Sequence, residues 1–151
     1  MSLMTHQYLK ETLKYLIRSK PFIKKDIKEV ERLFNMTEIE LFAYKEKQFL
    51  KIFKSAITKS KFYKKFYADA GITIGDIKSL KDLNKLPILT KETLRLNNDL
   101  IPIVPKWQLI NAKTSGTTGT PLRLYHSYSS IKKEQAYIIK NREQRGFLYG
   151  S

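Results

Sequence analysis

The chain has 151 residues, with 29 Lys and Arg against 14 Asp and Glu, two His and no Cys. This length suits one ordinary domain, and a hydrophobic content of 42% is sufficient for a core. The lack of cysteine excludes a disulfide scaffold, a thiolate zinc site and a cysteine nucleophile. Two well-separated histidines cannot form a metal site on their own, and the residues predict neither a metal centre nor a catalytic acid–base pair.

The net charge of +15 is spread along the chain. Residues 1–70 carry 16 basic and 8 acidic residues, residues 71–110 carry 6 and 4, and residues 111–151 carry 7 and 2. Lysine dominates and no Arg-rich block is present, which favours a solvated surface over a nucleic-acid-binding stripe. A non-catalytic basic module that binds nucleic acid or another polyanion remains the alternative interpretation.

No apolar run approaches the ~20 residues that a membrane-spanning helix needs. Lysines interrupt each apolar group near the N-terminus, which is not typical of a signal peptide. We therefore expect no membrane span and a cytoplasmic location.

Helical spacing extends from residue 5 to residue 70. A first helix is predicted before Pro21, which should end it, and a short second helix is predicted over residues 27–34. The strongest amphipathic pattern follows, with apolar residues three and four positions apart and lysines between them. Its apolar positions are Phe49, Ile52, Phe53, Ala56 and Ile57.

Aromatic residues continue this pattern over residues 62–70, after a weak break at residues 58–60. Gly71 is suited to cap the end of the helix. Aromatic rings between lysines can stack on nucleobases, but that use needs an exposed sheet or groove. A buried aromatic core is therefore the favoured interpretation of these rings.

Residues 72–108 predict short helices and connectors. Ser79, with an acid three residues later, and Thr90 are typical helix N-caps. Prolines at positions 102 and 105 indicate an extended or turning segment, and Trp107 is expected to pack beneath the strand that follows.

Residues 107–127 predict a strand, a loop and a second strand. Seven of the nine residues from Lys113 to Pro121 are Gly, Ser or Thr. Such a loop offers unhindered backbone N–H groups and several hydroxyl donors, a combination that suits a phosphate. Lys113, and Arg123 on the second strand, could add positive charge. The glycine spacing is not that of the Walker-type loop, and a polar hairpin connection is the alternative interpretation.

The string Thr114–Pro121 resembles the Ser/Thr/Gly-rich phosphate loop of the adenylate-forming superfamily, which includes acyl- and aryl-CoA ligases. Leu122 stands where most members have lysine, and the phenylacetate-CoA ligase branch with its CapK-like relatives is similar in this respect. Residues 60–71 and 80–91 are also similar to the segment that precedes the loop in that branch. The resemblance covers roughly residues 45–150.

This resemblance implies an α/β fold, in which a helical N-terminal region of residues 1–70 leads into an incomplete mixed sheet. Residues 71–151 would be the truncated start of the AMP-binding domain. A helix is predicted over residues 130–145, with Gly146 as its cap.

The resemblance also implies a two-step reaction, in which a carboxylic acid and ATP give an acyl-adenylate that is then transferred to coenzyme A or another acceptor. ATP and Mg²⁺ are the implied cofactors, with coenzyme A as a further candidate. The residues expected to hold the β- and γ-phosphates are Thr114, Ser115, Gly116, Thr117, Thr118, Gly119 and Thr120. Motifs that complete the site in this superfamily lie after the loop and are not present in the chain. A truncated sheet would expose part of its core, so self-association is also expected.

We therefore predict that the isolated chain does not adenylate a carboxylic acid, because it lacks the residues that would bind ribose and stabilise the reacting α-phosphate. An ATP–pyrophosphate exchange assay with a panel of carboxylic acids should show no turnover above background. Exchange that depends on the added acid would contradict this expectation.

Overall fold

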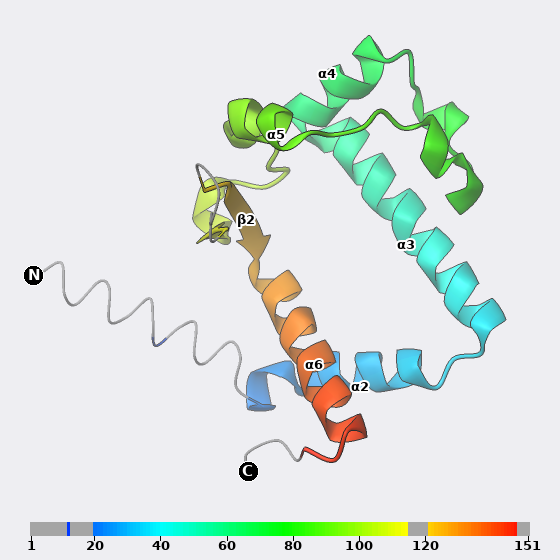
Figure 1. Ribbon diagram of the computed structural model, residues 1–151, viewed down its shortest axis with the longest axis vertical. Helices are drawn as coiled ribbons and strands as arrows, with labels where there is room; N and C mark the ends of the chain where they lie inside the picture. Colours follow the sequence, from blue (N-terminus) through cyan, green and yellow to red (C-terminus); the bar gives the residue numbers. More distant parts are fainter. Residues whose placement is uncertain (1–11, 13–19, 115–120, 148–151) are drawn as a thin grey trace, which may run out of the picture. The chain divides into compact units, whose positions relative to one another are not determined.

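The computed structural model describes residue 12, residues 20–114 and residues 121–147 (Figure 1). The chain divides into two compact units, one formed by Met1–Met36 with His126–Ser151 and the other by Thr37–Tyr125. The described residues are mostly helical, and their sheet has two antiparallel strands. The expected fold class, a helical region that leads into an incomplete sheet, is thus confirmed. The predicted domain division at residue 70 stays a prediction.

The first unit contains two packed helices, α2 (Lys20–Phe34) and α6 (Tyr128–Gln144). Pro21 lies in the first turn of α2, where its missing N–H costs no helical hydrogen bond, so this proline begins a helix. The helix predicted before Pro21 lies outside the described residues. Buried aliphatic side chains line the contact, namely Ile23, Val30, Leu33, Ile131, Ala136 and Ile139.

Salt bridges surround this apolar contact. Lys133 Nζ lies 3.0 Å from Glu29 Oε1, and Lys140 Nζ lies 3.2 Å from Glu31 Oε1. Lys132 Nζ lies 3.7 Å from Oδ2 of the buried Asp26. Basic residues from the C-terminal part of the chain thus pair with acidic residues from its N-terminal part.

The second unit begins with helix α3 (Glu38–Lys59) and helix α4 (Lys61–Asp69). Ser60 lies between them, and its side chain accepts a hydrogen bond from Tyr63 N at the start of α4. The predicted break at residues 58–60 is therefore confirmed. Gly71 follows α4 with a positive φ of 71°, the left-handed conformation expected of a glycine cap.

Aromatic rings form the core of this unit. Phe53, Tyr67 and Ile77 are buried, and partly buried apolar side chains from α3, α4 and the following segment surround them. The ring centroids of Phe53 and Tyr67 lie 5.3 Å apart, and burial raises the pKa of Tyr67. The aromatic pattern is thus a packed core, as predicted.

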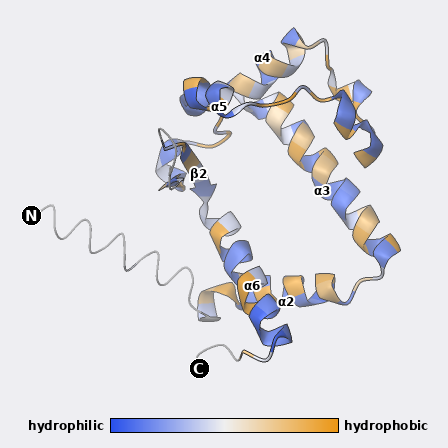
Figure 2. Cartoon of the chain, viewed as in Figure 1, coloured by the Kyte–Doolittle hydropathy of each residue, from blue (hydrophilic) through white to orange (hydrophobic). Residues whose placement is uncertain are grey.

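Helix α3 does not bury every position of its apolar face. Ile52 is 66% exposed, whereas the neighbouring Phe53 is only 4% exposed. Figure 2 shows the alternation of apolar and polar residues along α3. Ile52 belongs to the predicted apolar positions but lies in solvent, whereas Phe53 is part of the aromatic core.

Short helices fill the rest of the second unit. They are η1 (Ile74–Asp76), η2 (Leu80–Lys85), α5 (Lys91–Asn97), η3 (Asn98–Leu100) and η4 (Lys106–Gln108). The predicted caps are confirmed, because Asp82 accepts from Ser79 N at 3.0 Å and Thr90 Oγ1 accepts from Thr93 N at 3.1 Å. Trp107 is 79% exposed, so the prediction that it packs beneath a strand is wrong. None of the helices in the described ranges combines the length and apolarity needed to cross a bilayer.

Replacement of Phe53 by alanine should lower the free energy of unfolding by about 3–5 kcal/mol, because it opens a cavity inside the aromatic core. Phe42 lies on the same helix and is 51% exposed, so Phe42→Ala is a matched control with a loss of less than about 1 kcal/mol. Urea unfolding followed by circular dichroism measures both. Equal losses for the two variants would show that Phe53 is not part of a packed core.

Candidate functional site

The candidate site is a hairpin made of β1 (Leu109–Lys113) and β2 (Arg123–Ser127). The two predicted strands are therefore confirmed. Thr114 and Leu122 close the base of the loop: Thr114 N donates to Leu122 O at 3.0 Å, and Leu122 N donates to Thr114 Oγ1 at 3.0 Å. Both ends of the Gly/Ser/Thr-rich connection are thus held together.

Thr114 is the one predicted phosphate-binding residue within the described part of the chain. Its backbone N–H is engaged by Leu122 and its hydroxyl oxygen already accepts one bond, which leaves the hydroxyl proton for donation to a ligand. The other predicted positions lie outside the described residues, namely Ser115, Gly116, Thr117, Thr118, Gly119 and Thr120. Their role as phosphate ligands stays a prediction.

The strand that leaves the loop is also held by residues outside the hairpin. Asn98 Nδ2 donates to the carbonyl oxygen of Arg123 at 2.7 Å. Tyr125 donates its hydroxyl to Asp99 Oδ1 at 3.2 Å, and Lys106 Nζ lies 2.6 Å from the same carboxylate oxygen. Two consecutive residues of η3 therefore bond to Arg123 and Tyr125 of β2.

The same short segment is tied to the helical core. Ser60, which is 1% exposed, donates its hydroxyl to the carbonyl oxygen of Leu100 at 3.2 Å. Because Ser60 also caps α4, one buried side chain connects the break between α3 and α4 with η3. Asn98, Asp99 and Leu100 therefore link the aromatic core to the strand that follows the loop, and we call these three residues the η3 anchor.

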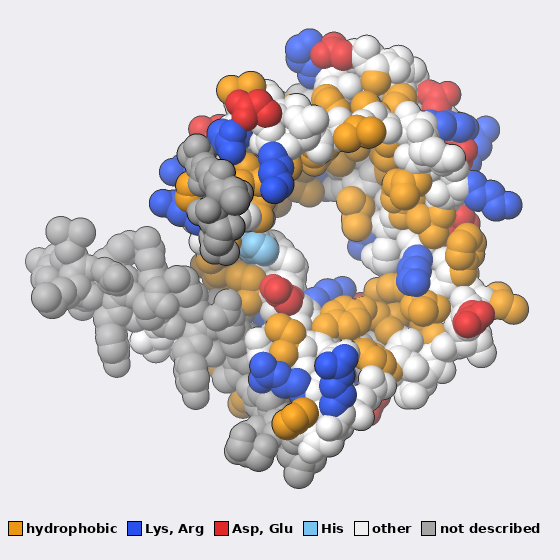
Figure 3. All heavy atoms as spheres, viewed as in Figure 1, with side chains coloured by type: hydrophobic (Ala, Val, Ile, Leu, Met, Phe, Trp, Pro, Cys, Tyr) orange, Lys and Arg blue, Asp and Glu red, His pale blue; other side chains and the backbone are white. Residues whose placement is uncertain are grey.

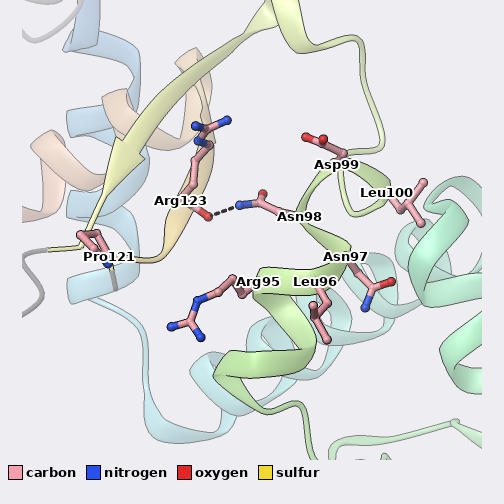
Figure 4. A pocket seen from close by; sticks show the side chains of 8 residues that line it. All are labelled: Arg95, Leu96, Asn97, Asn98, Asp99, Leu100, Pro121 and Arg123. Atoms are coloured by element: carbon pink, nitrogen blue, oxygen red, sulfur yellow. Dashed lines mark hydrogen bonds between the residues drawn. The ribbon is translucent and has the colours of Figure 1, made fainter. Parts of the chain in front are cut away.

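A pocket of about 320 Å³ lies beside the exit of the loop. Figure 4 shows the Asn98 amide directed at the Arg123 carbonyl, with the guanidinium groups of Arg95 and Arg123 on opposite sides of Asn98. Pro121, the last residue of the predicted loop, also lines the pocket. The complete lining consists of Arg95, Leu96, Asn97, Asn98, Asp99, Leu100, Pro121 and Arg123.

The positive groups near the pocket have acidic neighbours. Arg95 forms an ion pair with Glu92, and Lys106 forms one with Asp99. The hydrogen bond from Lys106 lowers the pKa of Asp99, and Tyr125 and Arg123 contribute in the same direction. Asp99 thus carries a negative charge that holds Lys106 and Tyr125 together.

Positive charge does not gather into a single patch on the face drawn in Figure 3. Lys and Arg side chains are scattered there among apolar and uncharged ones. No group of three or more His, Asp or Glu in the described ranges could hold a metal ion. The pocket beside the loop exit is the candidate ligand-binding feature among the described residues.

The sequence does not predict the residues that hold β2, namely Asn98, Asp99, Lys106 and Tyr125. Their interactions join positions up to 26 residues apart, and the short run Asn97–Asp99 has no spacing that points to β2. The proline-rich segment before β1 predicted only a turn.

No protein-family model matches the chain. The chain is similar to the protein CapK of Staphylococcus aureus, with 26% identity over 145 residues. This similarity covers 93% of the chain and 32% of CapK. The chain therefore spans about a third of the length of that relative.

The contacts of Asp99 with Lys106 and Tyr125 should depend on pH, because they require an ionised Asp99 carboxylate. A carboxyl group can have a lower pKa in the folded than in the unfolded state. Such a group stabilises the folded state at pH values above its pKa in the unfolded state. This contribution is lost as the pH falls through the folded pKa. Titration of the Asp99 carboxyl carbon by NMR should therefore give a pKa below the usual range of Asp.

Lys106→Gln should raise the pKa of Asp99 toward its ordinary value, because the hydrogen bond from Lys106 is the largest cause of the shift. Tyr125→Phe should have a smaller effect, since it removes only the hydroxyl. An ordinary pKa for Asp99 in the unmodified protein would show that this contact does not persist in solution.

Proposed function

We propose that this chain supplies the polyphosphate-binding part of a CapK-like, ATP-dependent adenylate-forming ligase. The observation that carries the proposal is the string Thr114–Pro121, which forms the connection of a hairpin closed by Thr114 and Leu122. The similarity to CapK extends over 145 residues and supports a relationship well beyond the loop.

In the proposed reaction, a carboxylate oxygen of the substrate attacks the α-phosphorus of ATP. The bond to the β-phosphate breaks, and the products are an acyl-adenylate and pyrophosphate. The thiol of coenzyme A, or another acceptor, then attacks the acyl carbon and AMP leaves. Mg²⁺ bound to the phosphates would share the charge of the leaving pyrophosphate.

The role of the loop in this reaction is to position the leaving group. Its hydroxyl and amide donors would hold the β- and γ-phosphates, so that the bond to be broken lies in line with the attacking oxygen. A hairpin closed at its base restricts the loop before the ligand arrives, which lowers the entropic cost of binding. The hydroxyl proton of Thr114, and the side chains of Thr117 and Thr118, are the proposed donors.

Exposed apolar side chains support the proposal that the chain works within a longer polypeptide. Ile88, Leu96 and Trp107 of the second unit are each more than three-quarters exposed, with exposed fractions of 89%, 76% and 79%. Apolar surface of this kind is typical of an interface. Since the chain matches about a third of CapK, we propose that the remaining part of such a ligase covers these side chains.

The isolated chain should bind MgATP and inorganic tripolyphosphate with similar affinity, and it should not bind adenosine. The physical reason is that the proposed contacts are made to phosphates, whereas the ribose-binding motifs of the superfamily lie after the loop. Isothermal titration calorimetry measures all three. Thr117→Val with Thr118→Val removes two hydroxyl donors and should weaken phosphate binding more than tenfold.

Thr58→Val is the matched control, because the Thr58 hydroxyl bonds to the carbonyl oxygen of Lys54 within α3. This variant should bind MgATP like the unmodified chain. Titration with duplex DNA tests the alternative of a basic polyanion-binding module. Salt-dependent DNA binding, together with ATP binding that is unchanged in the Thr117/Thr118 variant, would overturn the proposal in favour of that alternative.

A further inference from the structure

The hairpin needs support beyond its own two strands. An isolated two-stranded hairpin is at best marginally stable in water, and β1 and β2 have five residues each. Leu122 is buried at the start of the exit strand, but Arg123 and Leu124 are exposed. Contacts from another element must therefore fix the position of this strand.

The η3 anchor provides these contacts. The Asn98 amide reaches the Arg123 backbone at 2.7 Å, and the Asp99 carboxylate receives the Tyr125 hydroxyl at 3.2 Å. Arg123 is two residues after Pro121, so the bond from Asn98 is formed directly beside the end of the loop. The bond from Asn98 restrains the position of the β2 backbone. The bond to Asp99 restrains the orientation of the Tyr125 side chain, and with it the rotation of β2.

The anchor itself cannot shift freely. The Leu100 carbonyl is held by the buried hydroxyl of Ser60, and Asp99 is held by Lys106, which precedes β1 by three residues. Asp99 is thereby tied to residues on both sides of the hairpin, Lys106 before β1 and Tyr125 within β2. A change at the anchor would alter the separation of the two strands that carry the loop.

From this geometry we infer that Asn98 and Asp99 are positioning residues for the loop between β1 and β2. The inference rests on the proposed function and deepens it. Neither residue is assigned a contact with the ligand. They set the spacing of Thr114 and Pro121, the described residues at the two ends of the loop.

Asn98→Leu tests the inference, because leucine has a similar size but cannot donate to Arg123. Thr58→Val is the control, since the Thr58 hydroxyl donates to the carbonyl oxygen of Lys54 within α3, and Thr58 does not line the pocket. Each variant loses one hydrogen bond from a side chain to the backbone. Thermal unfolding of both variants establishes whether they lose similar stability.

We expect Asn98→Leu to weaken the binding of MgATP by about five- to tenfold, which corresponds to one net hydrogen bond. Thr58→Val should bind like the unmodified chain. Hydrogen–deuterium exchange should be faster in residues 121–127 of Asn98→Leu, with α3 unchanged. Tyr125→Phe should give a smaller loss of affinity, because it leaves the Asn98 bond intact.

The outcomes separate this inference from the proposed function. If the unmodified chain binds MgATP and Asn98→Leu binds it equally well, the inference is overturned and the proposed function stands. An equal loss of affinity in Thr58→Val and Asn98→Leu would show a general effect of stability, which also overturns it. If the unmodified chain binds no MgATP, the proposed function fails and the inference fails with it.

Discussion

The hydrogen bond from the buried Ser60 hydroxyl to the Leu100 carbonyl connects the two structural features on which the candidate site depends. On one side lies an aromatic core that is formed by neighbouring helices. On the other side lies a short hairpin that has little core of its own. A buried hydroxyl that lost its partner would have a desolvation cost, so this contact favours one position of η3 over its alternatives.

Charge in this protein acts mainly through local pairs. Lysines of α6 meet acidic residues of α2, and Asp99 brings together Lys106 and Tyr125 from either side of the hairpin. The exposed pairs add little stability individually, because water and salt screen them. These pairs instead favour one register of α6 relative to α2, because a shifted register would separate Glu29 from Lys133.

The similarity to CapK and the exposed apolar side chains are consistent with each other. A chain that matches 32% of a longer relative would lack partners for part of its apolar surface. Trp107 illustrates this point, because it lies in η4, two residues before β1, and yet is 79% exposed.

Local signals in the sequence determined the ends of helices and the presence of the hairpin. The break at Ser60, the glycine after α4 and the cap at Thr90 depend on bonds between residues a few positions apart, so spacing alone predicted them. The hypothesis of a phosphate loop likewise depends on eight consecutive residues, Thr114–Pro121. Only the tertiary structure decided that Ile52 and Trp107 are exposed, that α2 pairs with α6, and that Asn98 and Asp99 hold β2. These features depend on contacts between residues 25 or more positions apart, or on the absence of a covering element, and hydrophobic periodicity carries no information on either.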